Sequence, residues 1–157
     1  MAPQQHWQLG VLRLMVKQLS SEAAGQACAS CGFTLFNPVR MMKTSKWGVY
    51  DDARFPGRSI IMLKTHYEEF TDVPAEETAA FMVDIKAAMA TIKNITGCER
   101  VNLAILGNAV SHVHAHLIPR FPSQEEFPNK SPWNDKRSLA PLTTEQLHQL
   151  IEQFQSH

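Results

Sequence analysis

Residues 112–119 read His-Val-His-Ala-His-Leu-Ile-Pro, so three histidines alternate with apolar residues. In a β-strand, side chains at positions i, i+2 and i+4 point to the same face. A strand therefore places His112, His114 and His116 on one face and the apolar residues between them on the other. A helix would scatter the three imidazoles around its circumference. The alternation predicts a strand with a polar, chemically competent face and a buried apolar back.

Three interpretations compete for these histidines. A single histidine on a strand is usually structural, but packing alone does not need three in register. Neutral imidazole is a common metal ligand, and Cβ atoms two positions apart on a strand are roughly 6.5–7 Å apart. Two neighbours can therefore chelate one ion, whereas all three cannot easily do so. The pattern favours imidazole chemistry on a phosphate or acyl group, with a metal site as the alternative.

Neighbouring segments predict the rest of a sheet. Residues 101–106 form an apolar strand, and Gly107-Asn108 has the composition of a hairpin turn into the histidine strand. Asparagine is also common at turns for backbone reasons alone. Residues 47–51 predict a short strand, and residues 59–63 predict a buried one.

Three helices are expected around this sheet. Residues 4–19 carry apolar side chains at helical spacing. A long helix begins near a capping Asp72 and closes at Gly97. A short amphipathic helix near the end of the chain begins with a capping box of Thr143 and Gln146. The apolar stripe of the long helix consists of Phe81, Ile85, Ala88 or Met89, and Ile92.

Composition narrows the class of protein. The chain has 157 residues, enough for one domain with a proper core, and its 15 basic residues balance 15 acidic ones. The balance gives no electrostatic case for a nucleic-acid or membrane partner, and no apolar run reaches the length of a membrane span. Arg13 and Lys17 interrupt the only apolar stretch that resembles a signal peptide. Three cysteines, an odd number, argue against a disulfide scaffold, so a cytoplasmic location is expected.

A second motif is Cys28-Ala29-Ser30-Cys31-Gly32. Two cysteines at C-x-x-C spacing can take adjacent corners of a tetrahedral zinc site. They supply only half of such a site, so chance spacing and a redox pair stay open as alternatives, although no thioredoxin-like strand precedes the motif. The third cysteine, Cys98, follows the long helix and is expected to be a buried small apolar residue.

The histidine motif, followed by Leu117-Ile118-Pro119-Arg120, closely resembles the histidine-triad (HIT) superfamily. The frame from Asn102 to Arg120, with Leu-Gly-Asn before the triad, is similar to a branch of diadenosine tetraphosphate hydrolase-like proteins. Upstream, Pro56-Gly57, an apolar strand, Lys-x-His and residues 70–74 resemble the family's approach to its long helix. The similarity covers roughly residues 28–135.

The resemblance implies an α+β fold with an antiparallel sheet of about five strands, one long packed helix, and N- and C-terminal helices. One HIT domain would span residues 1–157, with a helical extension over 1–27, a catalytic core over 28–120 and a C-terminal segment and helix over 121–157. Residues 121–141 read as a polar surface segment with one apolar outlier, Trp133. Members are commonly homodimers.

The resemblance also implies a reaction, the attack on the α-phosphorus of a nucleotide. By carry-over, His114 is the nucleophile that forms a nucleotidyl-histidine, and His116 contacts the phosphate oxygens. Asn108 stands where many members carry glutamine, and it is a candidate phosphate contact, as are Arg120 and Asn102. For Arg120, a solvated cation at the strand end is the equal alternative. The expected substrates are dinucleoside polyphosphates such as diadenosine tetraphosphate. Phosphoramidate hydrolysis, nucleotidyl transfer and nucleotide binding with little turnover are the alternatives.

Two departures from the family pattern bear on specificity. Ala109 stands where some nucleoside phosphoramidases have a serine that helps to protonate the leaving group, so polyphosphates are favoured over amines. Arg58 follows Pro-Gly where the family often has histidine, and no function is drawn from it.

The resemblance finally implies a structural zinc ion. Several bacterial members hold zinc with two cysteines, a later histidine and the first histidine of the triad, which here correspond to Cys28, Cys31, His66 and His112. Such a closed site would tie the N-terminal region to the catalytic strand. His66 alone would read as an ordinary strand-end residue.

Overall fold

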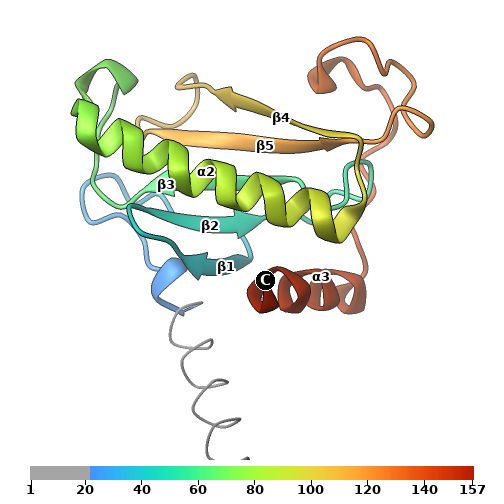
Figure 1. The fold of residues 1–157 in the computed structure, drawn as a ribbon, viewed down its shortest axis with the longest axis horizontal. Coiled ribbons are helices and arrows are strands. Elements are labelled where there is room, and N and C mark those ends of the chain that lie inside the picture. The colour runs from blue at the N-terminus through green and yellow to red at the C-terminus, as the bar shows by residue number, and fades with distance from the viewer. Residues whose placement is uncertain (1–21) are drawn as a thin grey trace, which may run out of the picture.

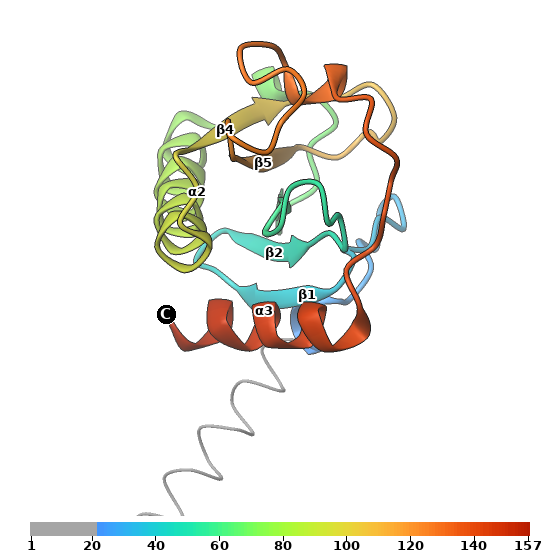
Figure 2. The same ribbon diagram turned by 90° about the vertical axis from the view of Figure 1, so that its right-hand side faces the viewer.

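The computed structural model of the chain describes residues 22–157, so the helix predicted for residues 4–19 lies outside the described part. Five strands form one antiparallel sheet in the order β1-β2-β3-β5-β4. One long helix, α2, runs across one face of this sheet, and α3 packs beside β1 (Figures 1 and 2). The elements are β1 (Pro38–Met41), β2 (Ser45–Val49), β3 (Ser59–Leu63), η1 (Phe70–Asp72), α2 (Ala75–Thr96), β4 (Arg100–Ile105), β5 (His114–Arg120), η2 (Pro132–Asn134) and α3 (Thr144–Ser156).

The core lies between the sheet and α2, and it confirms the predicted α+β architecture. Odd-numbered residues of the histidine segment face this core, as the alternation predicted, and the apolar stripe of α2 meets them. Asp84 of α2 is also buried, where it accepts hydrogen bonds from the Thr44 backbone N–H and from the Thr44 and Ser45 hydroxyls. These bonds fix α2 to the turn between β1 and β2. The buried core side chains from the two elements are Val113, Ala115 and Leu117 with Phe81, Ile85, Ala88 and Ile92.

The connection between β4 and β5 differs from the prediction of a tight hairpin. The two strands pair antiparallel, but their last pair is Ile105 with Ala115, so residues 106–113 form a loop rather than a two-residue turn. Strand β5 therefore begins at His114, and His112 lies just before it. The prediction of a two-residue turn at Gly107-Asn108 was wrong because the pairing of β4 with β5 already ends at Ile105 and Ala115.

Two other element boundaries also differ. The long helix begins after Pro74, and Asp72 belongs to the preceding 3-10 turn, so the prediction of an Asp72 cap was wrong. Pro74 fills the boundary position because its fixed φ suits the entry of a helix. Strand β1 was not predicted. Its paired neighbour β2 was predicted two residues late, at 47–51.

The ends of both helices confirm other predictions. Gly97 closes α2 in the left-handed region, with φ of 67°. At the start of α3, the Thr143 hydroxyl accepts from the Gln146 backbone N–H, and the Gln146 side chain accepts from the Thr143 backbone N–H. Cys98 is buried, as expected. No helix among the described residues is long and apolar enough to cross a membrane.

Gly57, in the turn before β3, is required by both its backbone conformation and its surroundings. Its φ is +96°, and an added Cβ would lie 2.8 Å from the Thr96 Cγ2 atom and 3.3 Å from the Phe154 ring. We expect Gly57→Ala to lower the free energy of unfolding by roughly 2–4 kcal/mol, from backbone strain plus overpacking. Gly97→Ala is the matched control, since its φ is also positive but nothing lies within 4 Å. Urea unfolding of both variants measures the difference, and equal losses would show that the close packing of the turn is unimportant.

Candidate active site

The register of the sheet aligns the candidate side chains along the face opposite α2. His114 pairs with Met62, and His116 pairs with Ile60, so the two histidines project from a central strand beside apolar residues of β3. His114 is buried, with 6% of its surface exposed, and His116 is partly buried. Their rings meet edge to face with centroids 5.0 Å apart. The strand therefore brings together two of the three predicted triad residues as direct neighbours.

The tautomer of His114 follows from one hydrogen bond. Its Nδ1 atom lies 2.6 Å from the carbonyl oxygen of His112. A carbonyl oxygen only accepts, so Nδ1 carries the proton in the neutral ring and Nε2 keeps its lone pair. The ring is also held by Phe33, whose centroid lies 5.5 Å away. In its neutral form, His114 is thus an oriented imidazole whose Nε2 lone pair has no hydrogen-bond partner among the described residues.

His116 is kept neutral by its surroundings. Burial, reinforced by the charges of His114 and Arg58, lowers its pKa to about 4. Its Nδ1 atom is buried and has no hydrogen-bond partner among the described residues. A buried imidazole with a free polar atom is suited to contact an incoming polar group.

The low pKa of His116 makes stability depend on pH. The folded chain resists protonation at His116 until about pH 4, whereas the unfolded chain takes up the proton near pH 6.5. The contribution of neutral His116 is therefore complete above about pH 6.5 and is lost as the pH falls from there toward 4. When the pH falls from 7.5 to 5, we expect the free energy of unfolding to drop by about 2 kcal/mol less in His116→Asn than in the parent. Urea unfolding at the two pH values measures this, and parallel losses would contradict it.

A cavity of about 420 Å³ opens beside the two histidines. His114 and His116 form part of its wall, and Asn108 and Ala109 of the loop before β5 form another part. The cavity is large enough for a small organic ligand and mostly apolar in its lining. Asn108 is therefore placed where the sequence suggested, near both histidines. The apolar lining consists of Phe33, Phe36, Tyr50, Ile60, Leu106 and Val110.

Cys28, Cys31, His66 and His112 converge in a separate cluster. One sulfur or nitrogen atom from each lies within 4.8 Å of all the others. The C-x-x-C turn is closed by hydrogen bonds from the Gly32 N–H to the Cys28 carbonyl and from the Cys28 N–H to the Phe33 carbonyl. Gly32 adopts a positive φ of 73°, which explains the glycine after the second cysteine. Residues far apart in the chain thus form one compact donor set.

The donor set fits a tetrahedral metal ion. The Nε2 atom of His112 lies 2.8 Å from the Leu63 carbonyl, so it carries the proton and leaves the Nδ1 lone pair free. The two Nδ1 atoms of His66 and His112 are 3.3 Å apart, and the two Sγ–Nδ1 separations are 3.4 and 3.8 Å. Zinc bond lengths in a tetrahedron give edges of about 3.3 Å between nitrogens and about 3.6 Å between sulfur and nitrogen. The distances and ligand types match a zinc site.

Arg120 and Asn102 occupy a different environment from the one predicted. The buried Arg120 guanidinium pairs with Glu125 and also donates to the carbonyls of Pro128 and Lys130. It donates to Asn102 Oδ1 as well, over 2.6 Å. Both residues therefore anchor the loop that follows β5. Their role as phosphate contacts stays a prediction that this geometry does not favour.

Several residues near the histidines escaped sequence reasoning. Arg58, which was given no function, lies close enough to His116 to lower its pKa. Trp133, an unexplained outlier in a polar segment, places its ring edge to face with His116 at 6.0 Å. Phe33 packs on both His112 and His114. Position after Pro-Gly was the only signal for Arg58, and the loop that carries Trp133 has no periodicity from which its position could be inferred.

Comparison with known proteins agrees with this fold and motif. Residues 48–123 match the model of the HIT domain. An uncharacterized HIT-like protein of Methanocaldococcus jannaschii is 31% identical over 78 residues, which cover 46% of this chain and 60% of the relative. An adenylylsulfatase of Arabidopsis thaliana is 32% identical over 69 residues, 41% of this chain and 35% of that protein. The chain thus spans less than two thirds of the length of these two relatives.

Solved structures share the fold. A histidine triad protein of Bradyrhizobium japonicum superposes with a TM-score of 0.68 at 23% identity, covering 76% of this chain and 87% of that one. A zinc-bound histidine triad family protein of Mycobacterium smegmatis gives 0.57 at 16% identity, with 77% and 85% covered. The diadenosine triphosphate hydrolase of Plasmodium falciparum gives 0.58 at 18% identity, with 92% and 95% covered. The family model, the relatives and the shared fold together show that the chain belongs to the histidine-triad superfamily.

Proposed function

We propose that the protein is a nucleotidyl hydrolase that attacks the α-phosphate of dinucleoside polyphosphates through His114. The observation that carries this proposal is the hydrogen bond of His114 Nδ1 to the His112 carbonyl, which leaves Nε2 as a free nucleophile. An imidazole that is neutral at pH 7 is a competent nucleophile without further activation. The ring is also fixed in orientation, which favours in-line attack.

The reaction proceeds in two displacements. The Nε2 lone pair of His114 forms a bond to the α-phosphorus while the bond from phosphorus to the bridging oxygen breaks, and its electron pair leaves with the polyphosphate. Water then attacks the same phosphorus, the N–P bond breaks, its electron pair returns to Nε2, and a proton is released to solvent. His116 faces the reacting phosphate from the next position on the strand, and the one N–H of its neutral imidazole donates to a phosphate oxygen.

The cavity beside the histidines supports a nucleoside as the group that remains attached. Its apolar and aromatic lining suits a base and sugar, and Asn108 supplies a polar contact near the phosphate. The similar proteins point to related chemistry, since one is an adenylylsulfatase and another a diadenosine triphosphate hydrolase. Adenylyl sulfate and dinucleoside polyphosphates both place an anionic leaving group on an α-phosphate.

Cys28, Cys31, His66 and His112 are proposed to hold a structural zinc ion. A four-ligand site is closed to substrate, so the ion would supply folding energy and rigidity. His112 also holds the catalytic strand, because its carbonyl orients His114 and its Nε2 donates to Leu63. The Mycobacterium smegmatis neighbour, which has a similar fold, is zinc-bound, and this supports the proposal.

A homodimer is proposed from the family resemblance. Strand β4 lies at one edge of the sheet, and Leu103 and Leu106 near that edge are 37% and 39% exposed. An edge strand with exposed apolar side chains favours pairing with another chain. Sedimentation of the full chain tests the assembly.

A substrate panel tests the proposed activity. Diadenosine tetraphosphate, adenylyl sulfate and an adenosine phosphoramidate are incubated with zinc-replete protein, and AMP release is followed. We expect the two substrates with anionic leaving groups to be hydrolysed faster than the phosphoramidate, because Ala109 cannot protonate an amine. Failure to release AMP from any of the three would overturn the proposal and favour a nucleotide-binding protein.

A further inference from the structure

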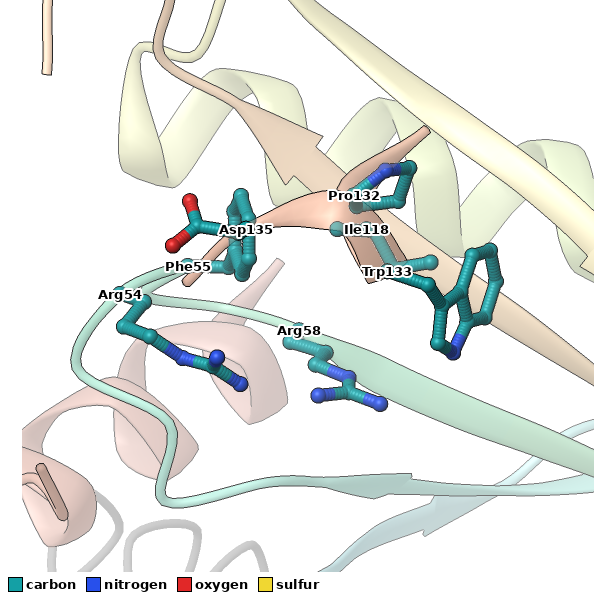
Figure 3. A pocket seen from close by; sticks show the side chains of 7 residues that line it. All are labelled: Arg54, Phe55, Arg58, Ile118, Pro132, Trp133 and Asp135. Carbon is teal, nitrogen blue, oxygen red and sulfur yellow. The ribbon is translucent and has the colours of Figure 1, made fainter. Parts of the chain in front are cut away.

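A second cavity, of about 120 Å³, lies beyond His116 on the same face of the sheet. In the antiparallel register, Ile60 lies opposite His116 and Ser59 opposite Leu117, so Arg58 comes next, beside Ile118. Both Arg58 and Ile118 line the cavity (Figure 3). Alternate strand positions are about 6.5–7 Å apart. The cavity therefore begins one such step beyond His116 and two steps beyond the proposed nucleophile.

The loop after β5 forms the opposite wall. Figure 3 shows Pro132, Trp133 and Asp135 of this loop facing Arg54 and Arg58, which come from the turn before β3. Arg120 holds the start of the loop through Glu125, and Arg137 donates to the Arg54 carbonyl. The Trp133 ring is thereby placed against His116, with centroids 6.0 Å apart.

The hydrogen bonds of the two lining arginines differ. Arg54 binds both carboxylate oxygens of Asp52, so its charge is matched. Arg58 donates to the same carboxylate through Nη1 alone. Its Nε atom is buried and has no partner among the described residues, and its guanidinium lies over the Tyr50 ring at 4.7 Å. Buried donors in native proteins are normally satisfied, so Arg58 retains hydrogen-bonding capacity that Asp52 does not use.

The charge around the cavity favours an anion. Arg54 and Arg58 share one carboxylate, Asp52, while Asp135 is matched by Arg137. Hydrogen bonds from the two arginines outweigh burial and hold the pKa of Asp52 below its usual value, so this carboxylate is charged and already occupied. One positive charge is left without a carboxylate of its own. A guanidinium with free donors in a partly buried site is suited to phosphate oxygens.

We propose that this cavity, which we call the arginine pocket (Arg54, Arg58, Ile118 and Trp133), binds the distal phosphates of the leaving group. The inference rests on the proposed attack of His114 on an α-phosphate. The leaving polyphosphate must extend away from the nucleoside cavity, and the arginine pocket lies past His116 along the same face. Arg58 then acts as a specificity-determining residue that favours polyphosphates over leaving groups without phosphate.

The pocket would assist bond breaking as well as binding. When the bond between the α-phosphorus and the bridging oxygen breaks, the electron pair stays on the departing oxygen, and negative charge grows on the polyphosphate. The Arg58 cation offsets that charge without transferring a proton. Trp133 screens the pocket from water on one side, which strengthens this electrostatic interaction.

Two substrates separate this role from the chemistry at His114. Diadenosine tetraphosphate has distal phosphates, whereas the p-nitrophenyl ester of AMP has a good leaving group without them. We expect Arg58→Gln to lower kcat/KM for the first at least thirtyfold and for the second less than threefold, with Arg58→Lys in between. Arg100→Gln removes an exposed arginine elsewhere and should change neither. Equal losses on the two substrates for a folded Arg58→Gln variant would overturn the inference.

A binding measurement on the parent protein covers the case in which Arg58→Gln does not fold. Inorganic tripolyphosphate is titrated calorimetrically into protein saturated with AMP. We expect it to bind beside AMP, and Arg58→Lys should weaken its binding at least threefold while Arg100→Gln does not. Absence of binding in the parent would overturn the arginine pocket. A parent that cleaves neither nucleotide substrate would instead overturn the proposed function, so the two failures are distinguishable.

Discussion

His114→Asn is expected to abolish turnover of diadenosine tetraphosphate, with kcat reduced by at least about a thousandfold. The asparagine amide can still donate to the His112 carbonyl that orients His114 in the parent, so the local structure is retained. What it lacks is a nitrogen lone pair able to attack phosphorus. Initial rates of AMP release under saturating substrate measure the effect.

The matched control is His148→Asn, which changes an exposed histidine on α3. This variant should hydrolyse the substrate at the parental rate and unfold at the parental temperature. If His114→Asn retains more than a tenth of the parental kcat while His148→Asn is normal, His114 is not the nucleophile.

Removal of the two cysteines of the proposed zinc site is expected to produce the largest loss of stability. Cys28→Ser combined with Cys31→Ser should eliminate stoichiometric zinc and lower the unfolding temperature by about 10 °C or more, because structural zinc contributes directly to folding energy. Activity should fall as well, since His112 belongs to the cluster and its carbonyl orients His114. Metal analysis and thermal unfolding of the same samples measure both effects.

Cys98→Ala is the matched control for a cysteine outside the cluster. Cys98 is buried between α2 and β4 and packs in the core. The variant should keep its full zinc content, even if it loses some stability from the smaller side chain. Zinc retained by the double cysteine variant, or an unfolding temperature that chelation leaves unchanged, would contradict a structural metal site.

The open face of the sheet divides its functions along one strand. His112 belongs to the cluster proposed to hold zinc, His114 lines the cavity proposed for the nucleoside, and His116 lines the same cavity and contacts Trp133 of the arginine pocket. The three histidines are chemically unequal because the carbonyls of Leu63 and His112 fix different tautomers. Spacing alone suggested equivalent residues, whereas hydrogen bonds give His112 and His114 different tautomers and burial lowers the pKa of His116.

Local patterns in the sequence predicted much of the fold. Three features could be predicted because each has one dominant physical cause. They are the alternation around His114, the apolar stripe of α2 and the capping box of Thr143. The Cys28 motif became readable only with the family resemblance, which supplied the two histidines that complete it. Those ligands come from segments far apart in the chain, which single-sequence patterns cannot bring together.

Features that depend on tertiary contacts were missed. Strand β1 is short and begins with Pro38, so its strand character comes from pairing with β2 rather than from propensity. The burial of Arg120 beneath the loop that it anchors was not predicted, since the two alternatives were a phosphate contact and a solvated cation at the strand end. That loop brings Trp133 into contact with His116, and the segment has no periodic pattern from which this contact could be predicted.

The central claim is a covalent nucleotide on His114, and rapid acid-free quenching tests it most directly. Protein mixed with excess diadenosine tetraphosphate is denatured within milliseconds and digested, and its peptides are weighed by mass spectrometry. The account predicts an adenylyl group on the peptide that contains His114, formed before steady state and absent from His114→Asn. Steady turnover of the substrate without any such adduct, or an adduct on another residue, would contradict it.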